Sequence, residues 1–590
     1  MKALFKKKWF AATLGIGVAI AITTFFGIAY FNDHAWGAWG DDSPGYVYLA
    51  ARMFTGENLI YQDELAYQGL QFFGDEKLAR WLTPTHHDFI NTNGVLASRY
   101  PLGLSLIMYL AAIITGTTKS FYFVVPFMAA ANIFLLYILS VVLFHSDKWK
   151  HAIGVLAGLS LGATPLYYTY ALSQPMREIP SIFFVLLSAI CIALIGHPVV
   201  QQSKKAIPAI TVLTIATAAA FGMAINIRET SLVILPAFLV YIIMLFRSNG
   251  MNSSKKESDD SADSVLTVKT FIISTVVFIG VLFVALLPTI QNSYQLSQEK
   301  EVFKKRDTSE VVLLSNIDHI QTISFSNIFN SEGKYKPNKG SLPQYWEVLQ
   351  DVYPVSYFLI FVLIGLVYGI RKYRKETMLL SVWIAGTLLI FSMWINPYSR
   401  YIMPLFPALF VIGAYGFISV LRNVHSHIAG KSTITSRLFG ALLVLIFLFA
   451  YLPLISDMKT NITDEDVYRN KAIAEYDLDQ LFTLEDIVDS STKTPIFLFA
   501  GNWQYGISET VESHTGIKTI RYPLEQKFSF DEAQVQQFFN EYILPRYDMY
   551  IWVDPTVSTE YYKWIQSLEV DLIAEQQYSF QKDVRIYSIR

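Results

Sequence analysis

Two acidic residues follow the first long apolar segment of the sequence and introduce a helical pattern. Asp41 and Asp42 open the stretch DDSPGYVYLAARMF, in which apolar and aromatic side chains recur at helical spacing, at Tyr46, Leu49, Ala50 and Met53. This spacing predicts an amphipathic helix that lies in the membrane interface. A carboxylate at its start could take a proton from a substrate hydroxyl. The two acids could equally cap the helix and stabilise its dipole.

Four arginines stand where other apolar segments begin or end. They are Arg99 in SRYPLGLSL, Arg177 in SQPMREIPS, Arg228 in NIRETS and Arg400 in NPYSRYIMP. A guanidinium group can hold a phosphate through two parallel hydrogen bonds. Alternatively, such an arginine reaches out to lipid headgroups, and Arg177 can pair locally with Glu178. Four arginines on one side of the membrane, near exposed carboxylates, would suit an anionic headgroup in a cavity open to that side.

Metal ligands and reactive thiols are scarce. His86, His87 and Asp88 are adjacent in a predicted loop, where histidines are usually solvated, and the single cysteine, Cys191, lies in an apolar run. We therefore expect no disulfide and no cofactor, while a divalent metal at His86, His87 and Asp88 stays open as the alternative. The formal net charge of −2 gives no reason to expect nucleic acid as a partner.

Composition indicates that lipid surrounds most of the chain. Of the 590 residues, 53% are hydrophobic and 16% are charged, against about 25% charged in soluble domains. The N-terminal KALFKKK precedes apolar residues 9–31, a run too long for a signal-peptide core, which we interpret as a retained first span. Further candidate membrane segments are 101–116, 121–144, 152–171, 179–197, 206–225, 230–246, 269–290, 352–370, 377–395, 400–421 and 437–456.

Basic loops indicate how these segments are oriented. Lysine and arginine concentrate in cytoplasmic loops, so KALFKKK places the N-terminus in the cytoplasm. Twelve full spans would put several later basic loops outside. The conflict disappears if the short segment 101–116, which begins with Pro101, is a half-inserted helix. The prediction is then eleven spans plus this helix, with these regions outside the cytoplasm: 32–100, 173–178, 291–351 and everything after residue 456.

The C-terminal part of the chain has a different pattern. Strand-like runs at 495–500 and 549–554 alternate with helix-like runs at 531–544 and 558–568. We therefore expect a membrane module, residues 1–456, and a small extracytoplasmic α/β domain, residues 457–590. The predicted fold class is an α-helical polytopic membrane protein that carries this domain at its C-terminus.

The order of these residues resembles the GT-C superfamily of polyprenyl-phosphate-sugar-dependent glycosyltransferases. The resemblance is closest to the branch of protein O-mannosyltransferases and lipid A aminoarabinose transferases. That branch has an acidic motif in its first outer loop, with Tyr, Ala and Met at set spacings after the Asp. Counted from Asp42, these are Tyr46, Ala50 and Met53, while Ser43 replaces the usual Glu. The resemblance thus gives Asp42 the place of the catalytic aspartate.

Three further motifs are similar to the same branch. RYPL at 99–102 resembles its Lys-Pro-Pro-Leu motif, and Glu178 with Pro180 resembles an Asp in its second outer loop. RYIMPLFP at 400–407 is similar to its Arg-Tyr-x-x-Pro-x-x-Pro pattern. The resemblance covers roughly residues 9–456 and does not include the C-terminal domain.

The resemblance implies an enzyme of the cell membrane that acts in the cell envelope. It would transfer a sugar from a polyprenyl-phosphate-linked donor, a membrane lipid, to a protein, lipid or glycan acceptor on the extracytoplasmic face. A single base acting opposite the leaving group implies inversion at the anomeric carbon. Asp42 and Glu178 would be the catalytic carboxylates. The substrate-binding residues would be Asp41, Tyr46, Arg99, Arg177, Arg228, Arg400 and Tyr401.

Other function classes remain open. A transporter or flippase of a glycolipid needs ionisable residues or broken helices near the membrane midplane, whereas the charges here cluster at segment ends. A glycan polymerase or ligase of another fold would usually carry a large outer loop late in the chain, which loop 291–351 allows. A structural membrane subunit is the third alternative.

Overall fold

The computed structural model of the chain describes only part of its residues. The described ranges are 2–34, 38, 43–74, 80–83, 89–90, 94–97, 100–172, 175–203, 205–253, 268–303, 328, 341–351, 355–394, 398–429, 493–500, 504–521, 532–553, 559–577 and 583–589. Several sequence-based predictions lie outside them: Asp41, Asp42, Arg99, residues 86–88, segment 437–456 and the domain boundary at 457.

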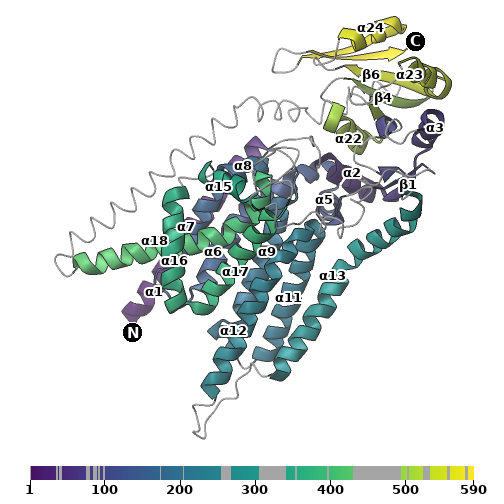
Figure 1. The fold of residues 1–590 in the computed structure, drawn as a ribbon. Helices are drawn as coiled ribbons and strands as arrows, with labels where there is room; N and C mark the ends of the chain where they lie inside the picture. Colours follow the sequence, from purple (N-terminus) through teal and green to yellow (C-terminus); the bar gives the residue numbers. More distant parts are fainter. Residues whose placement is uncertain are drawn as a thin grey trace.

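A bundle of long apolar helices makes up most of the described chain (Figure 1). The long helices are α1 (Lys2–Asp33), α6 (Val124–Leu143), α9 (Glu178–Ile195), α11 (Ala206–Ile227), α12 (Leu235–Ser253), α13 (Val268–Phe303), α16 (Val355–Lys372), α17 (Arg374–Ser392) and α18 (Phe406–Ala429). Short 3-10 turns lead into three of them: η2 (Thr118–Phe123), η3 (Glu229–Ile234) and η6 (Ser399–Leu405). The short helix α10 (Pro198–Gln201) precedes α11.

Length and hydropathy agree with a polytopic membrane protein. Within the described residues, eight helices are long and apolar enough to cross a membrane. A ninth crossing is formed if α7 (Lys150–Gly162) and α8 (Pro165–Leu172) count as one span bent by 61°. The bend falls before Pro165, because proline disfavours a helical conformation in the residue that precedes it. The fold class predicted from the sequence is confirmed, and the predicted count of eleven spans stays a prediction.

The segment predicted to be half-inserted is a short helix. It forms α5 (Leu102–Thr115), which begins after Pro101 and ends at Gly116, where φ is 73°. Fourteen residues extend about 21 Å at 1.5 Å per residue, less than the roughly 30 Å of a hydrocarbon core. The helix is thus too short for a full crossing.

The helix predicted after the two acidic residues also forms, as α2 (Ser43–Thr55), but it is not a surface helix. Every residue from Ser43 to Ala51 is buried. One side of α2 packs on α5, and the other packs on α22 (Gln504–Thr515) of the C-terminal domain. The predicted exposure of its polar face is therefore wrong for most of its length, because a second layer of protein covers the helix, whereas its location at the level of the membrane interface stays a prediction.

Small elements complete the first loop. Strands β1 (Ile60–Gln62), β2 (Phe89–Ile90) and β3 (Val95–Ala97) form an antiparallel sheet in the order β1-β3-β2. Helix α3 (Glu64–Phe73) is capped by Asp63, which accepts a hydrogen bond from Ala66 N (2.8 Å). A single 3-10 turn, η1 (Arg80–Leu82), follows.

The C-terminal domain is built on a five-stranded sheet in the order β5-β4-β6-β8-β7. Strand β4 (Thr494–Ala500) pairs in parallel with β5 (Lys518–Arg521) and β6 (Tyr547–Val553), whereas β8 (Asp583–Ile589) pairs antiparallel with β6 and β7 (Val570–Gln577). Its remaining helices are α23 (Glu532–Phe538), the π-helical turn η7 (Phe539–Ile543) and α24 (Thr559–Ser567). The predicted α/β character is confirmed.

Alternating side chains bind the two faces of this sheet to different layers. In β4, Phe497 and Phe499 join the same core as α2 and the membrane helices, whereas Ile496 and Leu498 join a second core. The second core also contains Trp81 of the first loop. The domain therefore sits on one end of the bundle, which we call the domain end, and the N-terminus lies at the opposite end (Figure 1).

One carboxylate ties three segments together at the opposite end. Asp147 Oδ2 lies 3.2 Å from Lys372 Nζ and 3.1 Å from Arg422 Nη1, and it accepts a hydrogen bond from Tyr373 Oη (3.0 Å). Although burial raises it, the pKa of Asp147 is lowered overall, because Trp149 N–H and Lys372 donate hydrogen bonds to the carboxylate. This contact joins the end of α6 to α16 and α18.

Candidate functional site: a buried arginine–glutamate cluster

Glu178, Arg228 and Arg400 come together at the domain end of the bundle. Glu178 Oε1 lies 3.8 Å from Arg228 Nη1 and 3.6 Å from Arg400 Nε. The side chain of Glu178 is fully buried and that of Arg228 is 2% exposed, whereas that of Arg400 is 16% exposed. One carboxylate against two guanidinium groups leaves one positive charge in excess. The cluster can therefore attract an anion, and Arg400 is its most accessible member.

Each member of the cluster stands where a helix begins or ends. Glu178 is the first residue of α9, Arg228 follows the last residue of α11, and Arg400 lies in η6. The helices α9 and α11 are themselves long, and η6 leads into the long helix α18. A polar side chain at a helix end can be charged without breaking the apolar surface that the helix presents to lipid.

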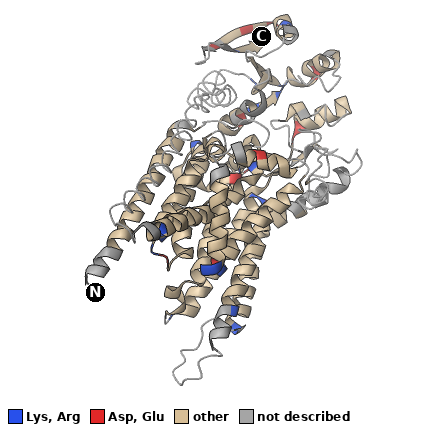
Figure 2. Cartoon of the chain, turned by 60° about the vertical axis from the view of Figure 1, so that its left-hand side comes forward, with Lys and Arg blue, Asp and Glu red and all other residues tan. Residues whose placement is uncertain are grey.

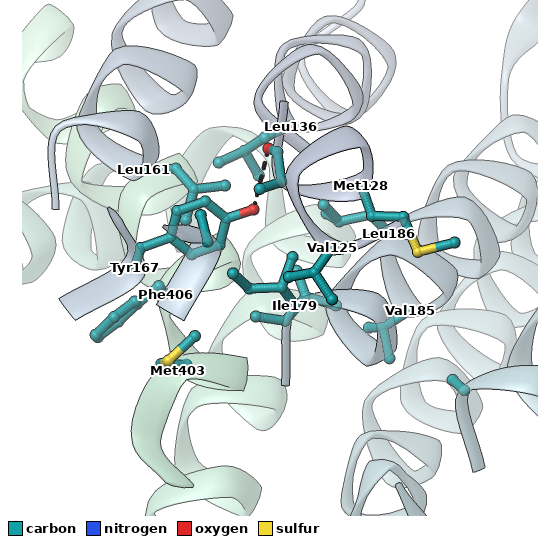
Figure 3. Close-up of a cluster of buried hydrophobic side chains, with 14 of the residues drawn as sticks. Val125, Met128, Leu136, Leu161, Tyr167, Ile179, Val185, Leu186, Met403 and Phe406 are labelled. Atoms are coloured by element: carbon teal, nitrogen blue, oxygen red, sulfur yellow. Dashed lines mark hydrogen bonds between the residues drawn. The ribbon is translucent and has the colours of Figure 1, made fainter. Parts of the chain in front are cut away.

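The start of α9 is fixed by the core next to it. Asn132 Nδ2 of α6 donates hydrogen bonds to Tyr167 Oη (3.0 Å) and to the carbonyl oxygen of Ile179 (3.1 Å), and Tyr167 Oη donates to Ala129 O (3.1 Å). Figure 3 shows Ile179 beside Val125 in this close-packed region. Because Ile179 adjoins Glu178, the packing of α6 and α8 also sets the position of the carboxylate.

Aromatic rings surround the two guanidinium groups. Arg228 Cζ lies 5.2 Å from the ring centroid of Phe391 and 5.1 Å from that of Tyr401. Arg400 Cζ lies 5.3 Å from the centroid of Tyr398 and 5.6 Å from that of Tyr401. Tyr401, predicted as a binding residue, thus lies between both arginines. The aromatic faces stabilise buried cations without neutralising the charge that an anionic ligand would need.

Several polar atoms of the cluster have no hydrogen-bond partner within the part of the chain that the structure describes. They are both carboxylate oxygens of Glu178, together with Nε and Nη1 of Arg228. The ion-pair distances of 3.6 and 3.8 Å exceed hydrogen-bonding distance. Buried polar groups are normally satisfied, and an exception calls for an explanation such as a functional role or a bound ion. The arrangement suits a site that a polar ligand completes.

Arg177 forms a second pair beside the cluster. Its Nη1 lies 3.9 Å from Glu229 Oε2, and both side chains are partly exposed. Arg177 precedes Glu178 and Glu229 follows Arg228, so the two pairs are adjacent along both chain segments. Three of the four predicted arginines are therefore brought together, and the fourth, Arg99, lies outside the described residues.

Sequence reasoning missed Tyr345. This residue lies in α15 (Ser341–Asp351), which belongs to the predicted outer loop 291–351 and packs on α16, α17 and η6. Its side chain is buried, and burial raises the pKa of Tyr345, with a smaller contribution from nearby Tyr401. Arg228 acts on the same hydroxyl in the opposite direction. The aromatic pair Tyr345-Trp346 inside an otherwise polar loop was the signal available in the sequence.

Tyr46 reaches the neighbourhood of the cluster through α5. Its ring centroid lies 5.0 Å from that of Tyr100, and its carbonyl oxygen accepts a hydrogen bond from Ser105 Oγ (2.9 Å). In α5, Gly103 is packed so closely against the backbone at Ile227 that a Cβ would not fit. The start of α2, α5 and the end of α11 are thus in continuous contact. Asp41 and Asp42, which directly precede α2 in the sequence, lie outside the described residues.

Within the described ranges, the structure contains no group of three or more His, Cys, Asp or Glu side chains that could hold a metal ion. The run at 86–88 lies outside these ranges.

Comparison with known proteins identifies the fold. No protein-family model matches the sequence, and no curated protein does. Among solved structures, ArnT from Cupriavidus metallidurans in the apo state is similar with a TM-score of 0.53 and 12% identity over 98% of both chains. The same protein bound to undecaprenyl phosphate gives a TM-score of 0.51 at 12% identity over 98% of this chain and 97% of that one.

A second protein shares the arrangement. The apo oligosaccharyltransferase from Archaeoglobus fulgidus is similar with a TM-score of 0.51 and 12% identity over 92% of this chain and 70% of its own. The similarity extends over nearly the whole chain, including the C-terminal region that the sequence motifs left uncovered. The chain has the fold of the GT-C glycosyltransferases, as its sequence motifs predicted.

Proposed function

We propose that the protein transfers a sugar from a polyprenyl-phosphate-linked donor to an acceptor on the side of the membrane that carries the C-terminal domain. The observation that carries this proposal is the buried Glu178–Arg228–Arg400 cluster, with its excess positive charge and unsatisfied polar atoms, at the domain end of a GT-C fold. The acceptor belongs to one of three classes: a protein, a lipid or a glycan of the cell envelope.

The arginines would bind the donor phosphate. Guanidinium groups form short, paired hydrogen bonds with phosphate oxygens. Arg400 and Arg228 supply one charge more than Glu178 cancels, and Arg177 with Arg99 would extend the same surface. One of the similar structures contains undecaprenyl phosphate, which supports a lipid-linked donor here. The prenyl chain would remain in the bilayer while its phosphate enters the domain end.

The reaction then needs one base. The acceptor oxygen forms a bond to the anomeric carbon as the bond from that carbon to the phosphate oxygen breaks. The phosphate leaves with the bonding electrons and needs no general acid, while Asp42 takes the acceptor's proton. Because the base acts opposite the leaving group, the configuration inverts. Asp41, Tyr46 and Tyr401 would line the substrate path.

The family resemblance implies a catalytic role for Glu178, but from its contacts we propose instead that it holds the arginines. Its carboxylate lies 3.8 Å from the guanidinium group of Arg228 and 3.6 Å from that of Arg400, where it acts as a counter-ion to both. It would set the spacing of Arg228 and Arg400 to fit a phosphate between them.

The orientation follows from the basic loops. Asp147 at the opposite end is surrounded by Lys372 and Arg422, and the N-terminal KALFKKK belongs to the same end. In Figure 2 most of the Asp and Glu residues that the structure describes, coloured red, lie toward the domain end. By the positive-inside rule, this distribution supports our proposal that the opposite end faces the cytoplasm and that the C-terminal domain lies outside the cell membrane.

Two isosteric substitutions test this proposal. Asp42→Asn keeps the shape of the side chain but removes its ability to accept a proton, so transfer from a lipid-linked sugar should fall about a hundredfold or more. Asp41→Asn is the matched comparison: Asn caps a helix as well as Asp does and keeps the shape of a side chain that lines the path, so transfer should fall far less than in Asp42→Asn. Full activity of both variants would refute the assignment of this acidic pair, and an inactive Asp41→Asn alone would shift the base by one residue.

A further inference from the structure

The C-terminal domain rests directly on α2. Helix α22 lies between the five-stranded sheet and α2 (Figure 1). Tyr48 Oη of α2 donates a hydrogen bond to Glu512 Oε1 of α22 (3.1 Å) and accepts one from Arg52 Nη1 (3.3 Å). The guanidinium of Arg52 stacks over the Tyr61 ring, 3.6 Å from its centroid. The C-terminal domain thus contacts α2 through directional polar interactions as well as through apolar packing.

Glu512 is itself rigidly held by the sheet of its own domain. Its Oε2 accepts hydrogen bonds from Thr519 N (2.8 Å) and Thr519 Oγ1 (2.9 Å) in β5. The neighbouring Lys518 pairs with Asp63, the residue that caps α3. The two oxygens of Glu512 therefore have separate partners, Thr519 in β5 and Tyr48 in α2. The carboxylate thus links the position of α2 to that of β5.

A third contact fixes α22 against the membrane helices. His514 Nδ1 lies 2.8 Å from Thr118 Oγ1, and His514 Nε2 lies 2.9 Å from Tyr122 Oη. Both hydroxyls belong to η2, which leads into α6. With contacts to α2, to the start of α3 and to η2, the domain is attached at three separated points, which determine its orientation on the bundle.

The other side of α2 is closely packed. Gly45 lies so close to the Tyr100 ring that a Cβ would not fit, and Ser105 Oγ donates to the carbonyl oxygen of Tyr46. Helix α2 is therefore held on one side by α5 and Tyr100, at Gly45 and Tyr46, and on the other by α22, at Tyr48. A shift of α22 would move the first turn of α2 or open one of these contacts.

We propose that Glu512 is a positioning residue, which fixes the start of α2 relative to the arginine–glutamate cluster through Tyr48. This inference rests on the proposed function, in which Asp42, directly before α2, acts as the base. The C-terminal domain thereby contributes to the rate of transfer without touching either substrate. A displacement of about 1 Å at a reacting group is enough to lower a rate by one to two orders of magnitude.

A double-mutant cycle on the full-length protein tests the contact. Tyr48→Phe and Glu512→Gln each weaken the link between α2 and α22, and each should lower kcat about tenfold. If both act through the same contact, the double variant should be no worse than either single variant. The Kd for polyprenyl phosphate should stay unchanged in all three variants, because none of them changes Arg228 or Arg400, the arginines of the cluster. Glu575→Gln is the matched control, since Glu575 pairs with Arg585 (2.8 Å) on the exposed β7–β8 ribbon, and its kcat should equal that of the unmodified protein.

Three outcomes overturn the inference: unchanged kcat in both single variants, losses that multiply in the double variant, or loss of polyprenyl phosphate binding along with kcat. The last would mean that the whole domain end had been disturbed. Tyr48→Phe is the conservative arm, so a misfolded Glu512→Gln leaves the test intact. Failure of the proposed function is distinguishable, because it would appear as full activity in Asp42→Asn, whatever the Glu512 variants do.

Discussion

Replacing Arg400 by alanine should weaken binding of the donor phosphate by about ten- to a hundredfold. Arg400 shares Glu178 with Arg228, so its removal abolishes the excess positive charge of the cluster. A phosphate about 5 Å from a unit charge gains about 3 kcal/mol at an effective dielectric constant of about 20. Hydrogen bonds to charged groups contribute about 1.5–3 kcal/mol. At about 1.4 kcal/mol per factor of ten, these values give the stated range.

The assay is displacement of a labelled polyprenyl phosphate from protein in nanodiscs, at low and high ionic strength. Arg400→Lys keeps the charge but loses the paired hydrogen bonds, so its Kd should fall between those of the alanine variant and the unmodified protein. Arg422→Ala is the matched control. Arg422 also pairs with a buried carboxylate, 3.1 Å from Asp147, but at the opposite end of the bundle, and its loss should leave the Kd unchanged.

Unchanged affinity in Arg400→Ala, or an equal loss in Arg422→Ala, would refute the reasoning.

Glu178→Gln separates the effect of charge on phosphate binding from its effect on stability. It keeps the shape of the side chain but leaves two buried guanidinium groups without their counter-ion, which should lower the thermal unfolding temperature. Affinity for the phosphate should be retained or rise at low salt, because the cluster then carries more positive charge. A large loss of affinity would show that Glu178 acts in some way other than as a counter-ion.

Two more predictions concern the domain and the topology. Burial, with repulsion from Lys119, lowers the pKa of His514 to about 4, below the value of about 6.5 in an unfolded chain. Stability of the docked domain should therefore fall as the pH drops from about 6.5 to about 4 and level off below. Thermal unfolding of His514→Gln should depend less on pH over this range, and an unaltered slope would contradict the assignment. A cysteine at the exposed Thr117 should react with an impermeant maleimide added to intact cells, whereas labelling only after permeabilisation would mean that 101–116 crosses the membrane.

The membrane helices could be predicted because each needs only a local property, an apolar run of sufficient length. The members of the charged cluster were also visible, since Glu178, Arg228 and Arg400 interrupt the sequence where such runs end. The spacing of these residues in the sequence does not predict that both arginines contact Glu178, because this depends on how α9, α11 and η6 pack together. For Tyr345 the aromatic pair with Trp346 was visible in the sequence, but the packing of α15 on η6, which brings Tyr345 to the cluster, was not.

The error over α2 has a specific physical origin. An amphipathic pattern records only the face that is apolar, and it predicts that the opposite face meets water or headgroups. On that face Tyr48 instead donates a hydrogen bond to Glu512, which is 464 positions away in the chain, and Arg52 donates to Tyr48. Polar residues that are paired across a domain interface look the same in a sequence as polar residues that are solvated.

The hydrogen bond between Tyr48 and Glu512 also determines when α2 can become fully buried during synthesis of the chain. Its partners are 464 positions apart in the chain. At about 5–20 residues per second, a ribosome needs roughly 20–90 s to travel from one to the other. By the end of that interval every membrane helix described here has been synthesised, but α2 still lacks one of the two layers that bury it. Docking of α22 therefore buries α2 only after all of these helices have been made.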